Sequence, residues 1–362
     1  MSAAGMHNVL KYFGGSILFS IVALVCAYFV GAQAGPGAGM TAVLTAAMLG
    51  LLETSLSFDN AVVNAKVLLT MDHFWRKMFI TVGILIAVFG MRVVFPLVIV
   101  WAVSDNGLWA VISMTWKSPM QFQKILVDQH ILVAGFGGSF LWMVFTNFFF
   151  DAEKDEHWLQ WLERPMRRLG KMDSVNVVVT VIISYVFSKF IHGGKGAEFL
   201  SATVLGVVTY LLVEGFTSFI KADQKHEEQK GAPKRVAAKL FSTGFASFLY
   251  LEVLDASFSF DGVIGAFALT NNLLIIALGL GIGAMFVRSL TIKLVEAGTL
   301  STYKFLEHGA FWAIGALSLI MYLKAAGVEP PEVVSGTIGA GLIGLSFLSS
   351  LRHNRTKAAE SA

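Results

Sequence analysis

Residues 53–60 read Glu-Thr-Ser-Leu-Ser-Phe-Asp-Asn, and residues 255–262 read Asp-Ala-Ser-Phe-Ser-Phe-Asp-Gly. Both segments lie inside long apolar stretches, and they match at a constant offset of 202 residues, from 53 to 255. A second pair of segments, residues 83–92 and 279–288, matches at an offset of 196, from 83 to 279. Two matched blocks in the same order indicate that the chain consists of two related halves.

The composition around these segments is that of a membrane protein. Of the 362 residues, 56% are apolar and only 14% are charged, against about 45–50% and about 25% in soluble domains. The net charge of +3 is too small to indicate nucleic-acid binding. The single cysteine, Cys26, excludes a disulfide within the chain and a site built from several thiolates.

The apolar stretches predict a bundle of membrane-spanning helices, because a span needs about 20 mostly apolar residues. We expect the first stretch to be a retained helix, since its apolar run is longer than the h-region of a signal peptide. The ten expected spans are approximately 14–32, 40–65, 78–103, 129–150, 174–190, 199–220, 240–268, 274–295, 308–325 and 334–350.

Lysine and arginine set the orientation of these spans, because cytoplasmic loops collect them. With the N-terminus in the cytoplasm, the inner segments hold 20 of these residues and the outer loops hold 5. This bias predicts ten spans with both termini cytoplasmic. Five spans per half is an odd number, so residues 1–195 and 196–362 are predicted to be two repeats of opposite topology, with a shared site near the midplane.

Two inner loops differ in character. Residues 151–173 carry tryptophans and aliphatic residues among arginines, which is typical of an amphipathic helix at a membrane surface. This interfacial loop is either a lipid- or partner-binding element or a connector with tryptophan anchors. Residues 221–239 are polar and mixed in charge, and we expect a flexible linker there.

Acidic residues inside the expected spans are costly, at about 2.5–3.5 kcal/mol each near the bilayer centre. Bound cations, protons, water or the arginines that follow each segment must therefore compensate for them. The candidate metal ligands are the carboxylates and one amide of the two repeated segments: Glu53, Asp59, Asn60, Glu252, Asp255 and Asp261. The supporting candidates are the serines of the segments and the two arginines: Ser55, Ser57, Ser257, Ser259, Arg92 and Arg288.

The spacing of the carboxylates requires a local break in the helices. Glu53 and Asp59 are six residues apart and would point in different directions on a continuous helix, as would Asp255 and Asp261. The residue after each later aspartate, asparagine or glycine, tolerates such a break. We therefore expect broken helices at both segments.

Oxygen ligands of this kind suit hard divalent ions such as Mn²⁺, Ca²⁺ or Mg²⁺. None of the eight histidines lies near either segment in the sequence, which disfavours softer metals. Protonation of the carboxylates, or their pairing with Arg92 or Arg288, stays open as the alternative.

The two segments resemble the paired motifs of the TerC family of bacterial integral membrane proteins, and the chain is most similar to a TerC-like branch of unknown function. The later motif is carried by residues 252–255, 259–262 and 266–268, and the earlier motif by residues 51–61. The sequence departs from that family at Gly262, where a second serine is frequent, and in its additional spans. The resemblance implies a bacterial inner-membrane protein linked to metal-ion efflux, chiefly of manganese, and to tellurite resistance.

Together these features predict an integral-membrane transporter of a hard divalent cation, with Mn²⁺ efflux favoured over Ca²⁺, working by alternating access. We expect no enzymatic activity, and the sequence has no GxxxxGK[ST] motif. The alternatives are a membrane scaffold or metal-sensing subunit with a structural acidic site, and a proton-coupled exporter of an organic solute. The expected partners are the lipid bilayer and the transported ion, without nucleic acid, and homo-oligomerisation is left open.

Overall fold

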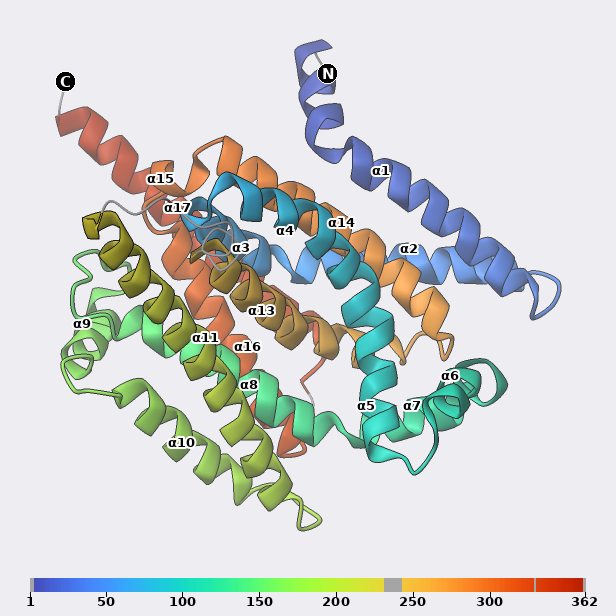
Figure 1. Cartoon of the computed structure of the whole chain (residues 1–362). Helices are drawn as coiled ribbons and strands as arrows, with labels where there is room; N and C mark the ends of the chain where they lie inside the picture. The colour runs from blue at the N-terminus through green and yellow to red at the C-terminus, as the bar shows by residue number, and fades with distance from the viewer. Residues whose placement is uncertain (1–2, 231–242, 329, 361–362) are drawn as a thin grey trace.

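Helices make up the regular structure, as the apolar stretches predict (Figure 1). The computed structural model describes residues 3–230, 243–328 and 330–360, and no strand occurs within these ranges. The helices up to Phe149 are α1 (Ala3–Ala32), α2 (Ala38–Leu56), α3 (Phe58–Thr70), α4 (His73–Leu85), the π-helix η1 (Ile86–Val94), α5 (Phe95–Val103), α6 (Leu108–Lys117), α7 (Pro119–Asp128) and α8 (His130–Phe149). The later helices are α9 (Gln160–Leu169), α10 (Val175–Ser188), α11 (Gly196–Lys230), α13 (Thr243–Ala266), α14 (Leu273–Glu296), α15 (Thr299–Thr302), α16 (Leu306–Ala325) and α17 (Glu332–Glu360).

Seven of the described helical segments are long and apolar enough to cross a membrane. They lie in α1, α2, the continuous run of α4, η1 and α5, and α8, α11, α14 and α16. The other three expected spans coincide with the 14-residue α10, with α13 and with α17. The chain is therefore a polytopic helical membrane protein.

The two repeated segments differ in their helical continuity. In the first, α2 ends at Leu56 and α3 begins at Phe58, so the helix is broken at Ser57 as expected. In the second, α13 continues from Thr243 to Ala266, so the expected break is wrong there. Gly262 permits a break but does not require one, because the hydrogen bonds of the helix continue past it.

The packing of the two halves supports their relationship. α3 packs on α16 and α8 packs on α13, which are equivalent pairs if the halves correspond helix by helix. Likewise α2 packs on α14, and α13 packs on η1. Figure 1 shows the α2–α3 pair and α13 running in opposite directions across the bundle. This arrangement is that of inverted repeats.

Close backbone approach joins the halves at glycines. A Cβ atom on Gly50 of α2 would lie 2.8 Å from a side-chain carbon of Ile282 on α14, and one on Gly279 would lie 2.7 Å from the Cβ atom of Leu49. Small residues allow helices to approach this closely in membranes. The α2–α14 contact therefore places the end of α2, which carries Glu53, directly beside the second half.

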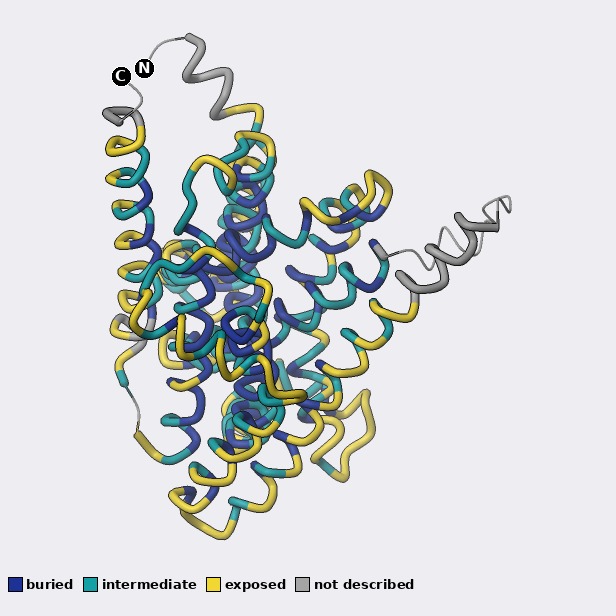
Figure 2. Tube along the Cα trace, turned by 90° about the vertical axis from the view of Figure 1, so that its left-hand side faces the viewer, coloured by how far each residue is buried: buried dark blue, intermediate teal, exposed yellow. Residues whose placement is uncertain are grey.

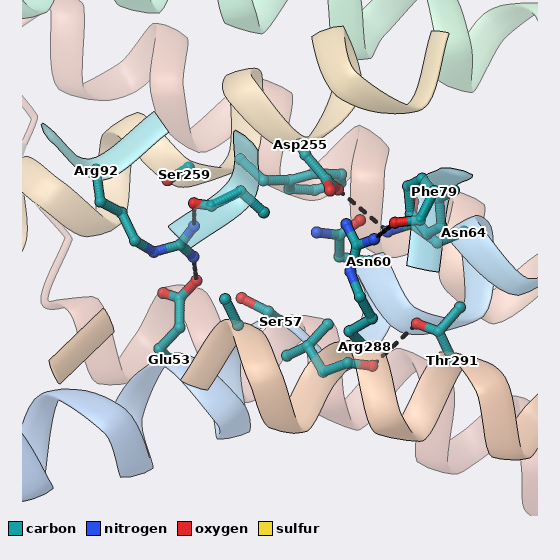
Figure 3. A pocket seen from close by; sticks show the side chains of 14 residues that line it. Glu53, Ser57, Asn60, Asn64, Phe79, Arg92, Asp255, Ser259, Arg288 and Thr291 are labelled. Atoms are coloured by element: carbon teal, nitrogen blue, oxygen red, sulfur yellow. Dashed lines mark hydrogen bonds and ion pairs between the residues drawn. The ribbon is translucent and has the colours of Figure 1, made fainter. Parts of the chain in front are cut away.

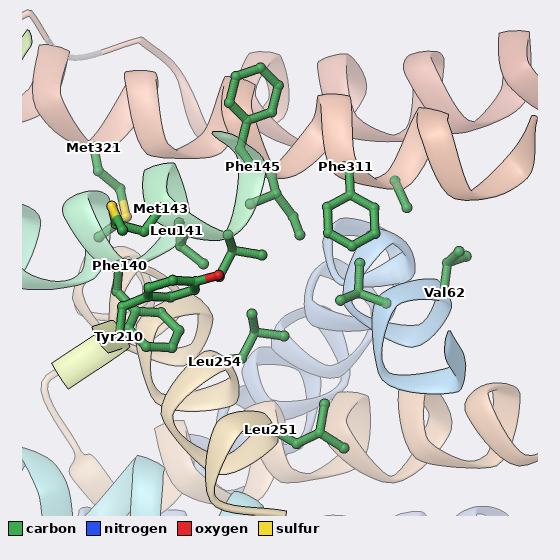
Figure 4. Close-up of a cluster of buried hydrophobic side chains, with 14 of the residues drawn as sticks. Val62, Phe140, Leu141, Met143, Phe145, Tyr210, Leu251, Leu254, Phe311 and Met321 are labelled. Carbon is green, nitrogen blue, oxygen red and sulfur yellow. The ribbon is translucent and has the colours of Figure 1, made fainter. Parts of the chain in front are cut away.

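Buried residues lie in the middle of the bundle and exposed residues lie on its outside (Figure 2). Apolar side chains occur in both places. The largest cluster is centred on α8, α13 and α16 and includes Phe140, Met143, Leu251 and Leu254 (Figure 4). Many outer apolar residues, such as Phe29, are exposed, as expected for a surface that faces lipid.

The segments between the spans contain structure that the sequence suggested only in part. Residues 160–169 form the expected surface helix α9, whereas the helices α6 and α7 were not predicted. The linker prediction for 221–239 is wrong over 221–230, because α11 continues to Lys230, and residues 231–239 lie outside the described residues. Figure 1 places α9 and the α6–α7 pair at opposite ends of the bundle.

Candidate functional site

A small cavity lies where the two halves meet, and we call it the central cavity (Figure 3). Its volume is about 30 Å³, which is room for about two water molecules or one ion. It is lined by residues of both repeats. The polar lining residues are Glu53, Ser57, Asn60, Asn64, Arg92, Asp255, Ser259, Arg288 and Thr291.

Glu53 forms a buried ion pair with Arg92 on one side of this cavity. The Nη2 atom of Arg92 donates to Oε1 of Glu53 at 2.6 Å. The other terminal nitrogen of Arg92 donates to the carbonyl of Ala87, one π-helical turn earlier. π-Helical turns inside α-helices are rare, and those that occur are frequently at functional sites. Here the η1 segment holds Arg92 against the end of the broken helix.

Asp255 lies on the opposite wall and joins the two halves. Its Oδ1 accepts a hydrogen bond of 3.1 Å from Nδ2 of Asn64 on α3. Arg288 lines the same wall, donates to the carbonyl of Phe79 and stacks over the Phe79 ring at 3.9 Å. Arg288 forms no ion pair within 4.0 Å among the described residues, unlike Arg92. The two equivalent arginines therefore have different partners.

Several buried polar atoms of the central cavity have no hydrogen-bond partner within the described part of the chain. They are Oδ1 of Asn60, Oδ1 of Asn64, Nε of Arg92, Oγ of Ser259 and Nη2 of Arg288. Buried polar groups in native proteins are nearly always satisfied, by protein, water or an ion. The lining of the central cavity therefore has the capacity to bind water or a ligand.

Glu252 is buried one helical turn before Asp255. Neither of its carboxylate oxygens has a hydrogen-bond partner among the residues described. A Cβ atom added to Gly83 would lie 2.7 Å from Oε1 of Glu252 and 3.0 Å from Nη1 of Arg288. Because Gly83 has no side chain, the carboxylate of Glu252 and the guanidinium of Arg288 can both lie close to the backbone of α4.

A second cavity, the acidic cavity, adjoins the first. It has a volume of about 70 Å³ and shares Glu53, Ser57 and Phe258 with the central cavity. Both Asp59 and Asp261 line it. The sequence therefore predicted correctly that these two aspartates approach one place.

Asp59 and Asp261 differ in their partners. Asp59 is in the first turn of α3, where the helix dipole favours a negative charge, and its Oδ1 accepts from the backbone N–H of Asn60 at 2.9 Å. No basic side chain lies within 4.0 Å of it in the described ranges. Asp261 instead accepts two hydrogen bonds from Nζ of Lys324, each of 2.8 Å. Lys324 lies in the last turn of α16.

A third cavity, of about 380 Å³, lies on the far side of Asp261 and is lined by Lys324, His130 and Gln123, among others. The three cavities follow one another along α13. Asp255 and Ser259 line the central cavity, and Asp261 lines both the acidic cavity and the third. Carboxylates therefore line a row of three neighbouring cavities between the two halves.

The candidate ligands do not form one compact metal centre. Among the described residues, no group of three or more His, Cys, Asp or Glu side chains is arranged to hold a metal ion. The carboxylates are distributed along the row, and two of them are held by basic side chains. The alternative in which an arginine pairs with a carboxylate applies to Glu53, whose partner is Arg92.

The four candidate serines have different places. Ser57 and Ser259 line the central cavity. Ser55 is exposed and donates to the carbonyl of Leu51, and Ser257 is buried but donates to the carbonyl of Val253 in its own helix. The structure therefore does not bring Ser55 or Ser257 to the cavities.

Three residues of the site were missed by the sequence argument. Asn64, Lys324 and Gly83 lie outside the segments that were singled out, although each contacts or adjoins a candidate carboxylate. Asn64 follows Asn60 by four residues and therefore shares its helical face, so this spacing could have identified it. Lys324 had no comparable signal, since only the packing of α16 on α8 and α3 brings it to Asp261.

A family model described as "Protein of unknown function (DUF475)" matches residues 58–357 of the chain. This finding overturns the TerC resemblance, because DUF475 is a different membrane family. Short motifs of serine, phenylalanine and aspartate at the same spacing are evidently not specific to one family.

An uncharacterized membrane protein of Bacillus subtilis (strain 168), YceF, is 28% identical over 157 residues, which is 42% of this chain and 58% of the relative. The chain thus matches somewhat more than half the length of that relative. No solved structure matches the chain.

Proposed function

The chain belongs to the DUF475 family, whose description assigns no activity. From the geometry of its site, we propose that it transports a hard divalent cation across the membrane. Mn²⁺ is the favoured substrate and Ca²⁺ the alternative. The observation that carries this proposal is the row of three cavities between the halves, lined by carboxylates of both repeats. A substrate site between inverted repeats is typical of secondary transporters.

The charge of the row favours a divalent cation. The three cavities are lined by four carboxylates and three basic side chains, and Glu252 is buried one helical turn from Asp255, so the formal charge of the row together with Glu252 is −2 when all are ionised. The carboxylates are Glu53, Asp59, Glu252, Asp255 and Asp261, and the basic residues are Arg92, Arg288 and Lys324. One divalent cation or two protons would neutralise this excess, and a buried excess charge is costly. Because one divalent cation and two protons carry the same charge, the proposed transporter can exchange one for the other.

The lining atoms suit a hard cation. Carboxylate oxygens, the amide oxygens of Asn60 and Asn64 and the hydroxyl of Ser259 are oxygen donors, which Mn²⁺, Ca²⁺ and Mg²⁺ prefer. The amide and hydroxyl oxygens have no partner among the described residues and are therefore available to an ion or its water.

In this proposal, basic side chains of the protein neutralise two of the carboxylates while no cation is bound. Lys324 holds Asp261 and Arg92 holds Glu53 when no substrate is present. An arriving cation releases these carboxylates, and the basic groups turn to water or to backbone carbonyls. Binding thus changes contacts between α13 and α16 and between α2 and η1, which couples the ion to a rocking of the halves.

The shape of the row favours alternating access. Along α13, Tyr250 lines a cavity of about 600 Å³ near the α9 end of the bundle, whereas Asp255 lines the central cavity. Leu251 and Leu254, both fully buried, lie between them in the sequence of the helix. We interpret these leucines as part of the closed side and the third cavity as the approach from the other side.

We further propose the inner membrane of a bacterium as its location, with both termini in the cytoplasm. The count of lysines and arginines supports this orientation. In that orientation α9 lies on the cytoplasmic side and the third cavity leads to the outside.

A flux measurement tests the proposal. Purified protein in liposomes should accumulate Mn²⁺ faster than empty liposomes, and the Asp59→Asn variant should reduce the rate at least about tenfold, because it removes a charge from the acidic cavity. Glu296→Gln is the matched control, since Glu296 is half-exposed and pairs with Lys11 away from the cavities. Its rate should equal that of the unchanged protein.

A membrane scaffold with a structural acidic site is the second candidate. The ion pairs Glu53–Arg92 and Asp261–Lys324 favour it, because they neutralise carboxylates without a bound metal. In that case liposomes with the protein would take up neither Mn²⁺ nor Ca²⁺, and Asp59→Asn would have no effect on flux.

A further inference from the structure

A separate cavity of about 360 Å³ lies beside α9, at the end of the bundle away from α6 and α7 (Figure 1). We call it the α9 cavity. Four of its six lining residues are arginine or lysine: the lining is Asp155, His157, Arg164, Arg167, Arg168 and Lys171. None of these residues belongs to the row of cavities described above.

The helix that carries this cavity is firmly attached to the bundle. Glu163 is buried, with 1% of its surface exposed, and accepts hydrogen bonds from the backbone N–H of Trp158 at 2.9 Å and from Nε1 of Trp312 at 3.1 Å. At the other end of α9, Gly170 packs so closely on Phe150 that a Cβ atom there would overlap the Phe150 carbonyl. The basic residues are therefore presented on a fixed element.

Most cations of the α9 cavity have no anionic partner in the protein. Arg167 is held, since its Nε donates to the carbonyl of Ala152 at 3.0 Å and its Nη2 lies 3.6 Å from Asp155. Arg164, Arg168 and Lys171 form no ion pair within 4.0 Å among the described residues. Three clustered cations without partners repel one another unless an anion lies between them.

The electrostatics of His157 agree with this concentration of positive charge. Burial lowers the pKa of His157 below its usual value, and Arg167 lowers it further, while Glu163 acts in the opposite direction. His157 thus stays neutral beside the arginines and can accept or donate one hydrogen bond without adding charge.

Exposed apolar side chains border the basic cluster. Trp161 is 76% exposed, and Leu169 and Met172 are 46% and 62% exposed. At 100° per residue Trp161 and Leu169 lie on one side of α9, next to the side that carries Arg164 and Arg168, and Met172 follows just after the helix ends. Tryptophan and aliphatic residues beside arginines are typical of a helix at the membrane interface.

We propose that the α9 cavity binds the phosphate group of an anionic phospholipid. The unpaired cations attract the headgroup, and the exposed apolar residues contact the acyl chains beside it. The same phosphate chemistry occurs in free inorganic phosphate, but the adjoining apolar surface favours the lipid. This site is independent of the proposed cation transport.

The test uses the purified full-length protein in a neutral detergent and native mass spectrometry. The protein is titrated with phosphatidylglycerol, with phosphatidylcholine and with inorganic phosphate. The triple variant R164Q/R168Q/K171Q removes the cluster, and K117Q/K124Q/K189Q removes three lysines elsewhere as the matched control. R164K/R168K/K171R keeps the charge and shows whether the fold tolerates changes at these positions.

The proposal predicts preferential binding of phosphatidylglycerol over phosphatidylcholine. It also predicts an affinity loss on the order of a hundredfold in the glutamine variant, since each basic residue near anionic lipid contributes about 1 kcal/mol. The charge-keeping variant and the control variant should bind like the unchanged protein. Equal phosphatidylglycerol binding by the glutamine variant would overturn the proposal. So would saturation by inorganic phosphate without any preference between the two lipids.

Discussion

Lys324 donates to both carboxylate oxygens of Asp261, at 2.8 Å each, while Asp59 on the same cavity has no basic side chain within 4.0 Å in the described part of the chain. One aspartate of the acidic cavity is thus neutralised by the protein and the other is not. Under the proposed transport function, the acidic cavity binds one additional cation or proton, and Lys324, which lines the third cavity, competes for the oxygens of Asp261.

Removing this competitor should strengthen cation binding. Lys324→Met is expected to lower the Mn²⁺ concentration for half-maximal flux by about tenfold or more, because hydrogen bonds to charged groups contribute about 1.5–3 kcal/mol. The measurement is the rate of Mn²⁺ uptake into liposomes as a function of concentration. Lys324→Arg keeps the charge and should leave the half-maximal concentration nearly unchanged. A weaker affinity in Lys324→Met would show that the lysine does not compete.

Separating the buried ion pair of Glu53 and Arg92 should destabilise the protein. Arg92→Met leaves a buried carboxylate without its partner, and Glu53→Gln leaves a buried guanidinium, so each should lower the free energy of unfolding by about 3–5 kcal/mol. The double variant removes both charges and should lose much less than the sum of the two. Unfolding in mixed detergent micelles measures these values. Additive losses would mean that the two residues do not act as a pair.

A methyl group added at Gly283, where α14 contacts α2, should destabilise the protein. A Cβ atom on Gly283 would lie 2.4 Å from Cβ and Cγ of Glu53, so Gly283→Ala should destabilise the protein by about 1–3 kcal/mol. Gly341 in α17 has no atom within 4 Å of such a position. Gly341→Ala should therefore be neutral or stabilising, by up to about 1 kcal/mol. Thermal unfolding of both variants checks the difference.

Lys154 should make stability depend on pH. This residue follows α8, and burial lowers its pKa from 10.5 to about 7. Its Nζ has no hydrogen-bond partner among the described residues and lies 3.0 Å from the centre of the Phe148 ring. Below pH 7 the lysine is charged in both the folded and unfolded states, and the full cost of burying that charge is present. Between about pH 7 and 10.5 the unfolded chain binds more protons, so stability rises with pH in this window.

The consequence is measurable with Lys154→Met, which removes the buried charge. This variant should be more stable than the unchanged protein near pH 7, and its advantage should shrink as the pH approaches 10. Lys171→Met removes an exposed charge on the same side of the bundle and serves as the control. An advantage of Lys154→Met that grows with pH would contradict the assignment.

The sequence predicted the spans and the approach of Asp59 to Asp261 well, and for a physical reason. Backbone groups in lipid must be satisfied within helices, so hydropathy alone locates the spans. The duplicated motif puts the two aspartates at matching positions of two predicted halves, and both line the acidic cavity. The break at Ser57 follows from the same reasoning, because a continuous helix would point Glu53 and Asp59 apart.

The partners of the carboxylates could not be predicted in the same way. Whether Arg92 reaches Glu53 depends on the π-helical turn of η1, and whether Lys324 reaches Asp261 depends on the packing of α16. Both are outcomes of tertiary packing with no signature in local sequence. The continuity of α13 could not be predicted from the local sequence either, since Gly262 permits a break without requiring one.

The proposed transport requires that carboxylates of both repeats bind one cation together, and a titration with Mn²⁺ measures this binding. Free Mn²⁺ gives a strong electron paramagnetic resonance signal that is lost on binding, so titration of the purified protein yields both stoichiometry and affinity. The account predicts one tightly bound Mn²⁺ per chain, lost in Asp59→Asn/Asp261→Asn and retained in Glu296→Gln. The same binding in the double variant as in the unchanged protein, or no binding in either, would contradict it.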